Sequence, residues 1–307
     1  MEVAGSVSQV GVERAIGGTP LHVYRYLRRN PLLVGGLSVL LFLFLFWAIG
    51  SLMVSREETR PLSAPARQRP SAEYPMGTDE VGRNIFAVMV AGTALTLQIG
   101  LIAGGLGVGF GAFLAFLGGY YAGSRLGWID TIIRGTVDTL QTVPSLLILI
   151  IIAASQSTGE PLSVLKIAII ISLLAWITPA RTIRAQVLTL RQRTYVDMAR
   201  QSGMSGLEII VKELMPNLMP YMVASFVLSV AAAILASIGL EALGLGPLES
   251  PTLGMTIYWN IYFGSLMLGL WWWWLPPIVI IVLLFVGLFL VTAGLDEWAN
   301  PRLRRRV

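Results

Sequence analysis

The chain has 307 residues, of which 55% are hydrophobic and only 13% are charged, so its composition excludes an ordinary soluble domain, which carries about 25% charged residues, and indicates a membrane protein. The absence of cysteine excludes a disulfide framework and thiol chemistry, and the one histidine, His22, cannot form a metal site alone. The net charge of +5 is typical of a basic cytoplasmic lipid face and does not require nucleic acid as a partner.

Six apolar runs predict an all-α membrane protein with six transmembrane helices, because about 20 apolar residues cross the hydrocarbon core of a bilayer. A predicted cytoplasmic tail, residues 1–30, precedes the first span, residues 31–54, which carries no charge. The second span is rich in glycine, and we expect close helix packing there because small residues permit it in lipid. The second to sixth spans are predicted over residues 94–118, 137–155, 163–180, 221–245 and 275–295.

The connection between the first two spans, residues 55–93, is predicted to be an external linker followed by a collar segment. Its first part is rich in proline and is expected to be irregular. The turn that follows, Gly77-Thr78-Asp79-Glu80, predicts the start of a helix with Thr78 or Asp79 as its cap.

The polar connection over residues 181–220 contains two predicted short helices. Gly203 suits the position just after a helix, where a positive φ costs glycine little. Ser205 can cap a second helix, and Glu208 three residues later completes a capping box. Pro216 is predicted to end that helix, because proline removes a backbone hydrogen bond. Such a pair of helices outside the membrane favours contact with a soluble partner; an ordinary amphipathic connector is the alternative.

Three polar residues are candidates for a substrate pathway, namely Gln141, Glu241 and Asn260. Ionisable groups within a span are costly and are usually functional or paired. Glu241 lies near the outer end of the fifth span, where it could face a cavity and meet a substrate cation; interfacial exposure or pairing with Arg83 is the alternative. The run Trp271–Trp274 is typical of an interfacial aromatic belt, since only one or two of four consecutive side chains can face a bundle interior.

Basic residues predict the orientation of the chain. With the N-terminus in the cytoplasm, most of the 22 lysines and arginines fall on the cytoplasmic side, as the positive-inside rule requires. Residues 181–220 and a basic tail, residues 296–307, are then cytoplasmic, while residues 55–93 and 246–274 are external.

The spacing within the polar connection resembles that of a known family. Asp197-Met198-Ala199 is followed by Gly203 and Pro216, which is similar to the EAA loop of ABC-importer permeases of the dipeptide, oligopeptide and nickel group. That loop carries Glu-Ala-Ala, a Gly four residues after the second Ala and a Pro thirteen residues after the Gly; here Asp replaces Glu and Met replaces the first Ala. The resemblance implies a type I ABC importer permease fold, with residues 94–295 as the transmembrane domain and cytoplasmic coupling helices between the fourth and fifth spans. The coupling residues that it implies are Tyr195, Val196, Asp197, Met198, Ala199, Gly203, Met204, Ser205, Leu207 and Pro216.

The same resemblance implies a cell-membrane permease that works by alternating access with several partners. These are a homologous permease that completes a heterodimer, two ABC ATPase subunits and an extracytoplasmic substrate-binding protein. The sequence has no G-x-x-x-x-G-K-[ST] phosphate loop, so ATP and Mg are expected on the ATPase subunits, and no catalytic residue, metal site or cofactor is expected in this chain.

The implied cargo is a dipeptide or oligopeptide, with nickel chelates and oligosaccharides as alternatives. An independent secondary transporter or a membrane-embedded enzyme is disfavoured, because the sequence has neither evident repeats nor a cluster of acid, base or metal-ligand residues.

Overall fold

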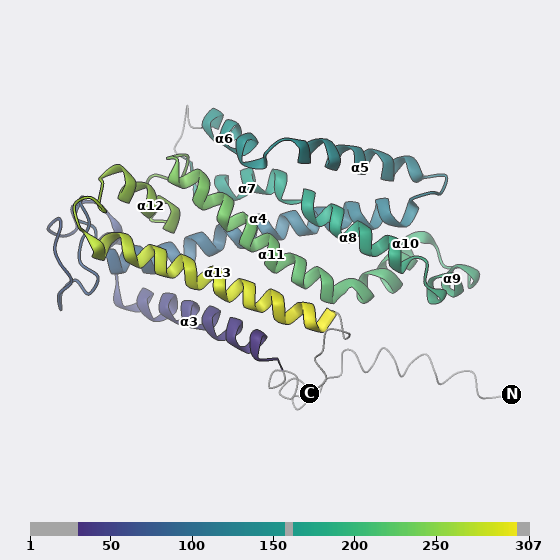
Figure 1. Ribbon diagram of the computed structural model, residues 1–307, viewed down its shortest axis with the longest axis horizontal. Helices are drawn as coiled ribbons and strands as arrows, with labels where there is room; N and C mark the ends of the chain where they lie inside the picture. The colour runs from purple at the N-terminus through teal and green to yellow at the C-terminus, as the bar shows by residue number, and fades with distance from the viewer. Residues whose placement is uncertain (1–29, 157–161, 300–307) are drawn as a thin grey trace.

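The computed structural model of the chain describes residues 30–156 and 162–299, and for residues 296–299 it describes the backbone alone. The described residues form helices and loops without a β-strand, in agreement with the predicted all-α fold. Residues 1–29 of the predicted N-terminal tail and residues 300–307 of the predicted C-terminal tail lie outside the described residues. The elements are α3 (Pro31–Met53), the 3₁₀ turn η1 (Arg56–Thr59), α4 (Ile85–Tyr121), α5 (Gly127–Thr142), α6 (Ser145–Gln156), α7 (Val164–Ala175), α8 (Ile177–Leu190), α9 (Thr194–Gln201), α10 (Gly206–Ile209), the π-helical turn η2 (Ile210–Leu214), α11 (Met215–Ala242), α12 (Leu253–Tyr262) and α13 (Trp271–Ala299) (Figure 1).

Four helical stretches are long and apolar enough to cross a membrane without a break: Pro31–Met53, Ile85–Tyr121, Gly206–Ala242 and Trp271–Leu295. Two bent helix pairs pass the same test, α5 with α6 and α7 with α8, so the described residues provide up to six spans.

The prediction of one helix over residues 137–155 is wrong, because α5 and α6 meet at 84°. Pro144 accounts for the break, since a proline disfavours helical geometry in the residue before it, and Val143 is extended with φ −98° and ψ 131°. The fourth predicted span is likewise two helices, α7 and α8, bent by 40°. Pro179 in the first turn of α8 has no N–H to donate to Ala175, which permits that bend.

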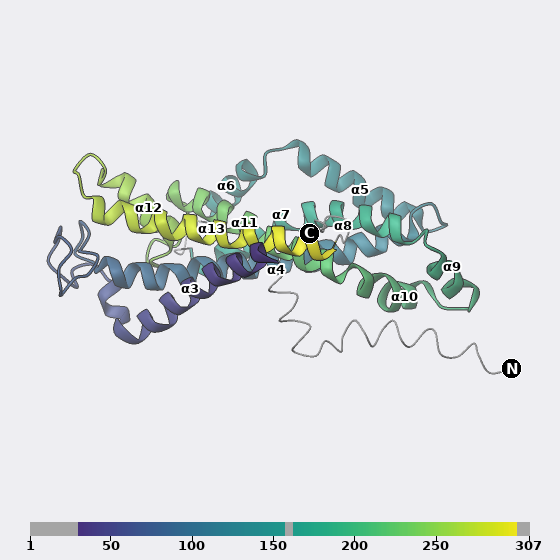
Figure 2. The same cartoon turned by 60° about the horizontal axis from the view of Figure 1, so that its bottom comes forward.

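The central helix of the bundle is α4, which packs against α3, α5, α7, α8, α11, α12 and α13 (Figure 2). At Gly104 its backbone lies close to that of α11, since an added Cβ would lie 2.7 Å from the backbone N of Val230. A Cβ added at Gly107 would lie 2.7 Å from the Cβ of Ala175 in α7. These contacts confirm the close packing predicted for the glycine-rich span.

Residues 55–84 fold over the end of the bundle near α12, and we call them the outer collar after the external position that the sequence predicts for them (Figure 1). Asp79 accepts a hydrogen bond from the backbone N–H of Arg83 at 2.8 Å and pairs with its guanidinium at 2.5 Å. Neither Thr78 nor Asp79 caps a helix, so that prediction is wrong. Asn84 caps α4 instead by accepting from the backbone N–H of Phe86 at 3.1 Å, which places the start of the helix before residue 94.

The tryptophan run divides between core and surface. Trp272 and Trp273 are buried, whereas Trp271 is exposed. The indole N–H of Trp272 donates to the backbone oxygen of Thr78 at 3.3 Å, so one member of the run holds the outer collar against α13. Two of the four side chains are therefore buried, which agrees with the expectation that only one or two consecutive helical side chains can face the bundle interior.

The first described helix, α3, packs mainly against α13 (Figure 1). The side-chain amide of Asn30 donates to the backbone oxygen of Gly294 at 2.9 Å. A Cβ added at Gly36 would lie 2.6 Å from the backbone N of Val291, so the two backbones are in close contact.

Candidate functional site

The polar connection forms a compact helical tip at the end of the bundle opposite α12 and the outer collar (Figures 1 and 2). It consists of α9, a turn at Gly203, and α10, and we call it the α9–α10 tip (residues 194–209). The buried face of α9 carries Val196 and Ala199, which share a hydrophobic cluster with Ile209 of α10 and Val187 of α8. The tip is therefore an ordered part of the fold and not a loose connector.

The turn between α9 and α10 has the conformation that the sequence predicts. Gly203 has φ 83°, a left-handed value that favours glycine. Its N–H donates to the oxygen of Arg200 at 3.0 Å, and the N–H of Met204 donates to the oxygen of Ala199 at 3.2 Å. This pair of bonds is the Schellman arrangement that ends a helix, so the predicted break at Gly203 is confirmed.

The predicted capping box at the start of α10 is also confirmed. The Glu208 N–H donates to the Ser205 hydroxyl oxygen at 3.3 Å, and the Ser205 N–H donates to the Glu208 carboxylate at 3.0 Å. The pKa of Glu208 lies below its ordinary value because of the Ser205 backbone N–H and the Lys212 ammonium, whose Nζ lies 3.2 Å from a carboxylate oxygen. The charged form of Glu208 thus holds α10 to the turn.

Pro216 does not end the helix that begins after Ser205, so that prediction is wrong. The helix runs without a break from Gly206 to Ala242. In the π-helical turn η2, the Met215 N–H donates to the oxygen of Ile210, five residues back. Pro216 follows this turn as one of the first residues of α11, where its missing N–H is tolerated. The α9–α10 tip is therefore joined to α11 by a continuous helix.

The outer surface of the tip is exposed and chemically mixed. Asp197 is exposed at the edge of the cleft between the tip and the end of α4, and it pairs with Arg200 at 3.0 Å, an interaction between two exposed groups. Met198 and Leu207 are also exposed, whereas Tyr195 and Met204 are half-buried. The Tyr195 hydroxyl is buried and has no hydrogen-bond partner among the described residues.

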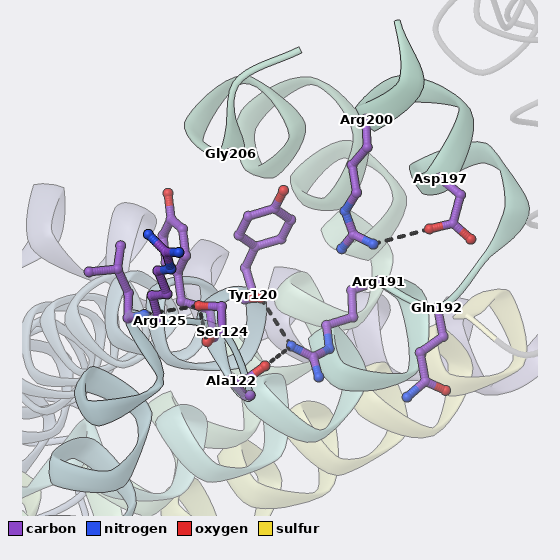
Figure 3. A pocket seen from close by; sticks show the side chains of 12 residues that line it. Tyr120, Ala122, Ser124, Arg125, Arg191, Gln192, Asp197, Arg200 and Gly206 are labelled. Carbon is purple, nitrogen blue, oxygen red and sulfur yellow. Dashed lines mark hydrogen bonds and ion pairs between the residues drawn. The ribbon is translucent and has the colours of Figure 1, made fainter. Parts of the chain in front are cut away.

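A cleft of about 820 Å³ separates the tip from the end of α4 (Figure 3). Arg191 crosses its floor and donates to the backbone oxygen of Tyr120 at 3.0 Å and to that of Ala122. The Arg200 guanidinium lies 5.6 Å from the Tyr120 ring centroid. The predicted coupling residues did not include Tyr120 or Arg191, because the contact joins positions 71 residues apart. Arg200 thus links the tip to the central helix, and Arg191 links the end of α8 to it.

The three pathway candidates lie apart from one another in different surroundings. Gln141 is exposed near the end of α5 and accepts a hydrogen bond from Arg181 of α8. Asn260 is buried in α12, where it accepts from the Ser265 hydroxyl at 2.5 Å. Glu241 is buried and accepts from Ser237, Thr252 and Met255, so its carboxyl group faces the protein interior in this structure.

The alternative pairing of Glu241 with Arg83 is wrong, because Arg83 pairs with Asp79. The Arg83 guanidinium also lies 5.8 Å from the ring centroid of Trp259, so both its charge and its planar face are already engaged.

The described residues form an all-helical membrane bundle with an ordered polar tip at one end. The chain matches the family of binding-protein-dependent transport system inner membrane components over residues 115–305. The chain belongs to this family, and it is a multi-pass permease subunit of an ATP-driven ABC importer, with ATP hydrolysis in separate subunits.

Curated relatives extend the match over most of the chain. The dipeptide transport system permease protein DppC of Bacillus subtilis is 30% identical over 282 residues, which cover 92% of this chain and 85% of that protein. The oligopeptide transport system permease protein OppC of Mycobacterium bovis is 29% identical and covers 73% of this chain and 75% of its own length. The glutathione transport system permease protein GsiD of Pectobacterium atrosepticum is 31% identical and covers 72% of this chain and 71% of its own length.

Proposed function

We propose that the α9–α10 tip is the surface that couples this permease to one ATPase subunit. The observation that carries the proposal is the exposure of large apolar side chains on an otherwise polar end of the bundle: Met198 is 56% exposed, Leu207 60% and Val211 56%. Apolar side chains beside exposed charges such as Asp197 are typical of the core and rim of a protein interface.

The coupling movement passes from the tip into two helices. The uninterrupted helix from Gly206 to Ala242 carries it towards the outer face, and Arg200 carries it into α4 through its contact with the Tyr120 ring. ATP-driven closure of the ATPases would then rock these helices and change the side to which the transport cavity opens, as alternating access requires. The tip supplies mechanical contact and no catalytic group.

The proposed cargo is a peptide, since relatives that align over most of the chain are named for dipeptide, oligopeptide and glutathione transport. A homologous permease completes the pathway as a heterodimer, and an extracytoplasmic binding protein delivers the peptide. Gln141 is proposed to line the pathway, because it is exposed on α5 beside the 84° break with α6, and irregular backbone at membrane depth is tolerated where it faces a cavity.

Cross-linking tests the proposed coupling surface. Met198→Cys carrying a short photoactivated cross-linker is expected to capture an ATPase subunit in the assembled importer, because its exposed side chain would lie within the interface. Ile261→Cys is the matched control: it is an apolar position of similar exposure, 66%, at the opposite end of the bundle. Capture of the ATPase from Ile261 and not from Met198 would overturn the proposal.

The proposed orientation places both termini and residues 181–220 in the cytoplasm, and residues 55–93 and 246–274 outside. Because the chain has no cysteine, single cysteines can report this directly. In intact cells an impermeant thiol reagent is expected to label Glu249→Cys and to leave Ser205→Cys unlabelled, although both positions are exposed in the chain. Permeabilised cells, in which both should react, provide the control. The reverse pattern would refute this orientation.

A further inference from the structure

We propose that Glu241 is a positioning residue that locks the outer helix α12 to α11, so that α12 moves with the helix that starts at the α9–α10 tip. Glu241 lies near the C-terminal end of α11 and has no exposed surface. Its carboxyl group accepts hydrogen bonds from the Ser237 hydroxyl at 2.7 Å, the Thr252 hydroxyl at 2.6 Å and the Met255 N–H at 3.1 Å. One side chain of α11 thus holds both the cap and the first turn of α12.

The N-terminus of α12 is built around this contact. The first N–H groups of a helix lack partners within the helix and favour an acceptor with negative charge. Here the Met255 N–H donates both to the Glu241 carboxyl group at 3.1 Å and to the Thr252 hydroxyl at 3.2 Å, and the Leu253 N–H donates to the Thr96 hydroxyl of α4 at 3.0 Å. A Cβ added at Gly254 would lie 2.3 Å from a Glu241 carboxyl oxygen, so only glycine leaves room for the carboxyl group.

The contact between α12 and the outer collar is of a different kind. Trp259 meets the outer collar through the guanidinium of Arg83, 5.8 Å from its ring centroid. The Trp259 indole N–H is buried and has no hydrogen-bond partner among the described residues. Breaking a buried hydrogen-bond network costs more than separating one ring from a cation. When the helices move, α12 is therefore expected to stay with α11 and to shift against the outer collar.

This inference rests on the proposed coupling function, because it extends the path of movement from the tip to the outer mouth. Gly206–Ala242 is one continuous helix with the Ser205 capping box at one end and Glu241 at the other. A displacement of the tip by an ATPase would reach the Glu241 carboxyl group along this helix. Glu241 then converts movement of α11 into movement of α12 at the outer face.

Distance measurements between spin labels in the assembled importer test the inference. One pair, Leu235→Cys with Ile261→Cys, reports α11 against α12; a second, Leu62→Cys with Ile261→Cys, reports the outer collar against α12, and all three positions are exposed. With Glu241 present, the first distance is expected to be the same in the nucleotide-free and ATP-trapped states, and the second is expected to change. With Glu241→Leu, the first distance should become broad and nucleotide-dependent, and peptide uptake per ATP hydrolysed should fall at least about tenfold.

Two further variants separate positioning from general stability. Glu241→Gln keeps the volume and one acceptor oxygen, so uptake per ATP should be partly restored relative to Glu241→Leu; it also serves as the test if the leucine variant does not assemble. Asn260→Leu removes another buried polar side chain of α12 and should leave the α11–α12 distance unchanged between nucleotide states. An unchanged α11–α12 distance and unchanged uptake per ATP in both Glu241 variants, with all subunits present, would overturn the inference. Failure of the wild-type chain to bind an ATPase would instead overturn the proposed function.

Discussion

Asp197→Lys is expected to reduce peptide uptake by the reconstituted importer at least about tenfold while leaving the permease folded and inserted. The side chain is 54% exposed, and its ion pair with Arg200 is between surface groups, so the loss of that pair costs the fold little. At the proposed ATPase interface, in contrast, charge reversal creates like-charge contact that costs several kcal/mol, and about 1.4 kcal/mol corresponds to a factor of ten. Uptake into vesicles, with subunit composition checked on a gel, provides the measurement.

Asp197→Asn is the matched control for the Asp197 prediction, because it removes the ion pair with Arg200 without reversing the charge and leaves Arg200 against the Tyr120 ring. If like-charge contact with the ATPase lowers uptake in Asp197→Lys, Asp197→Asn should keep most of the uptake. If the ion pair within α9 is the important interaction, both variants should lose uptake equally. Normal uptake by the single variant, with a full set of subunits, would remove the coupling role from the α9–α10 tip.

Gly104→Val is expected to destabilise the bundle. A Cβ at this position would lie 2.7 Å from the N and 2.9 Å from the Cα of Val230, and backbone atoms cannot rotate away as a side chain can. Overpacking of a tight core costs about 1–3 kcal/mol, and a contact between two backbones belongs at the upper end of that range. The variant should show a lower midpoint of thermal unfolding in detergent, followed by tryptophan fluorescence, and a lower yield of inserted protein.

Gly109→Val provides the control for Gly104→Val in the same helix. Nothing lies within 4 Å of a Cβ added at Gly109, so the substitution changes the same residue type without a clash. Its unfolding midpoint should remain close to that of the wild type. Equal losses at both positions would mean that helix propensity, and not the approach of α4 to α11, determines the cost.

Local features of the site could be predicted from the sequence because their partners are only a few residues away. The left-handed turn at Gly203 and the Ser205–Glu208 capping box depend on bonds that span five residues or fewer. The close packing of α4 could also be predicted, because glycines in a membrane span allow the backbones of neighbouring helices to approach closely.

The effects of Pro144 and Pro216 on their helices could not be predicted from the sequence. Pro144 separates α5 from α6 by 84°, although the apolar run around it predicted one helix. Pro216 was expected to break a helix, yet it follows a π-helical turn at the start of α11. The number of apolar residues in a run predicts the length of a membrane span, but it does not predict whether the helix bends within that span. The effect of a proline depends on which backbone carbonyl loses its hydrogen-bond donor.

The surroundings of Glu241 could not be predicted, because they depend on how the chain returns after α11. Thr252, eleven positions away, and the N-terminus of α12 come back to the carboxyl group only once that connection is folded. A buried carboxyl group in a span suggests either a pathway or a structural network, and the sequence does not distinguish the two.

The pairing of α3 with α13 has a consequence for the biogenesis of the protein. The Asn30–Gly294 hydrogen bond joins positions 264 residues apart, and the ribosome makes α3 first. For most of synthesis α3 must therefore remain in the bilayer without the helix that becomes its main neighbour. Because its sequence is apolar and carries no charge, α3 is stable in lipid before α13 is made. The bundle closes only when α13 leaves the translocon.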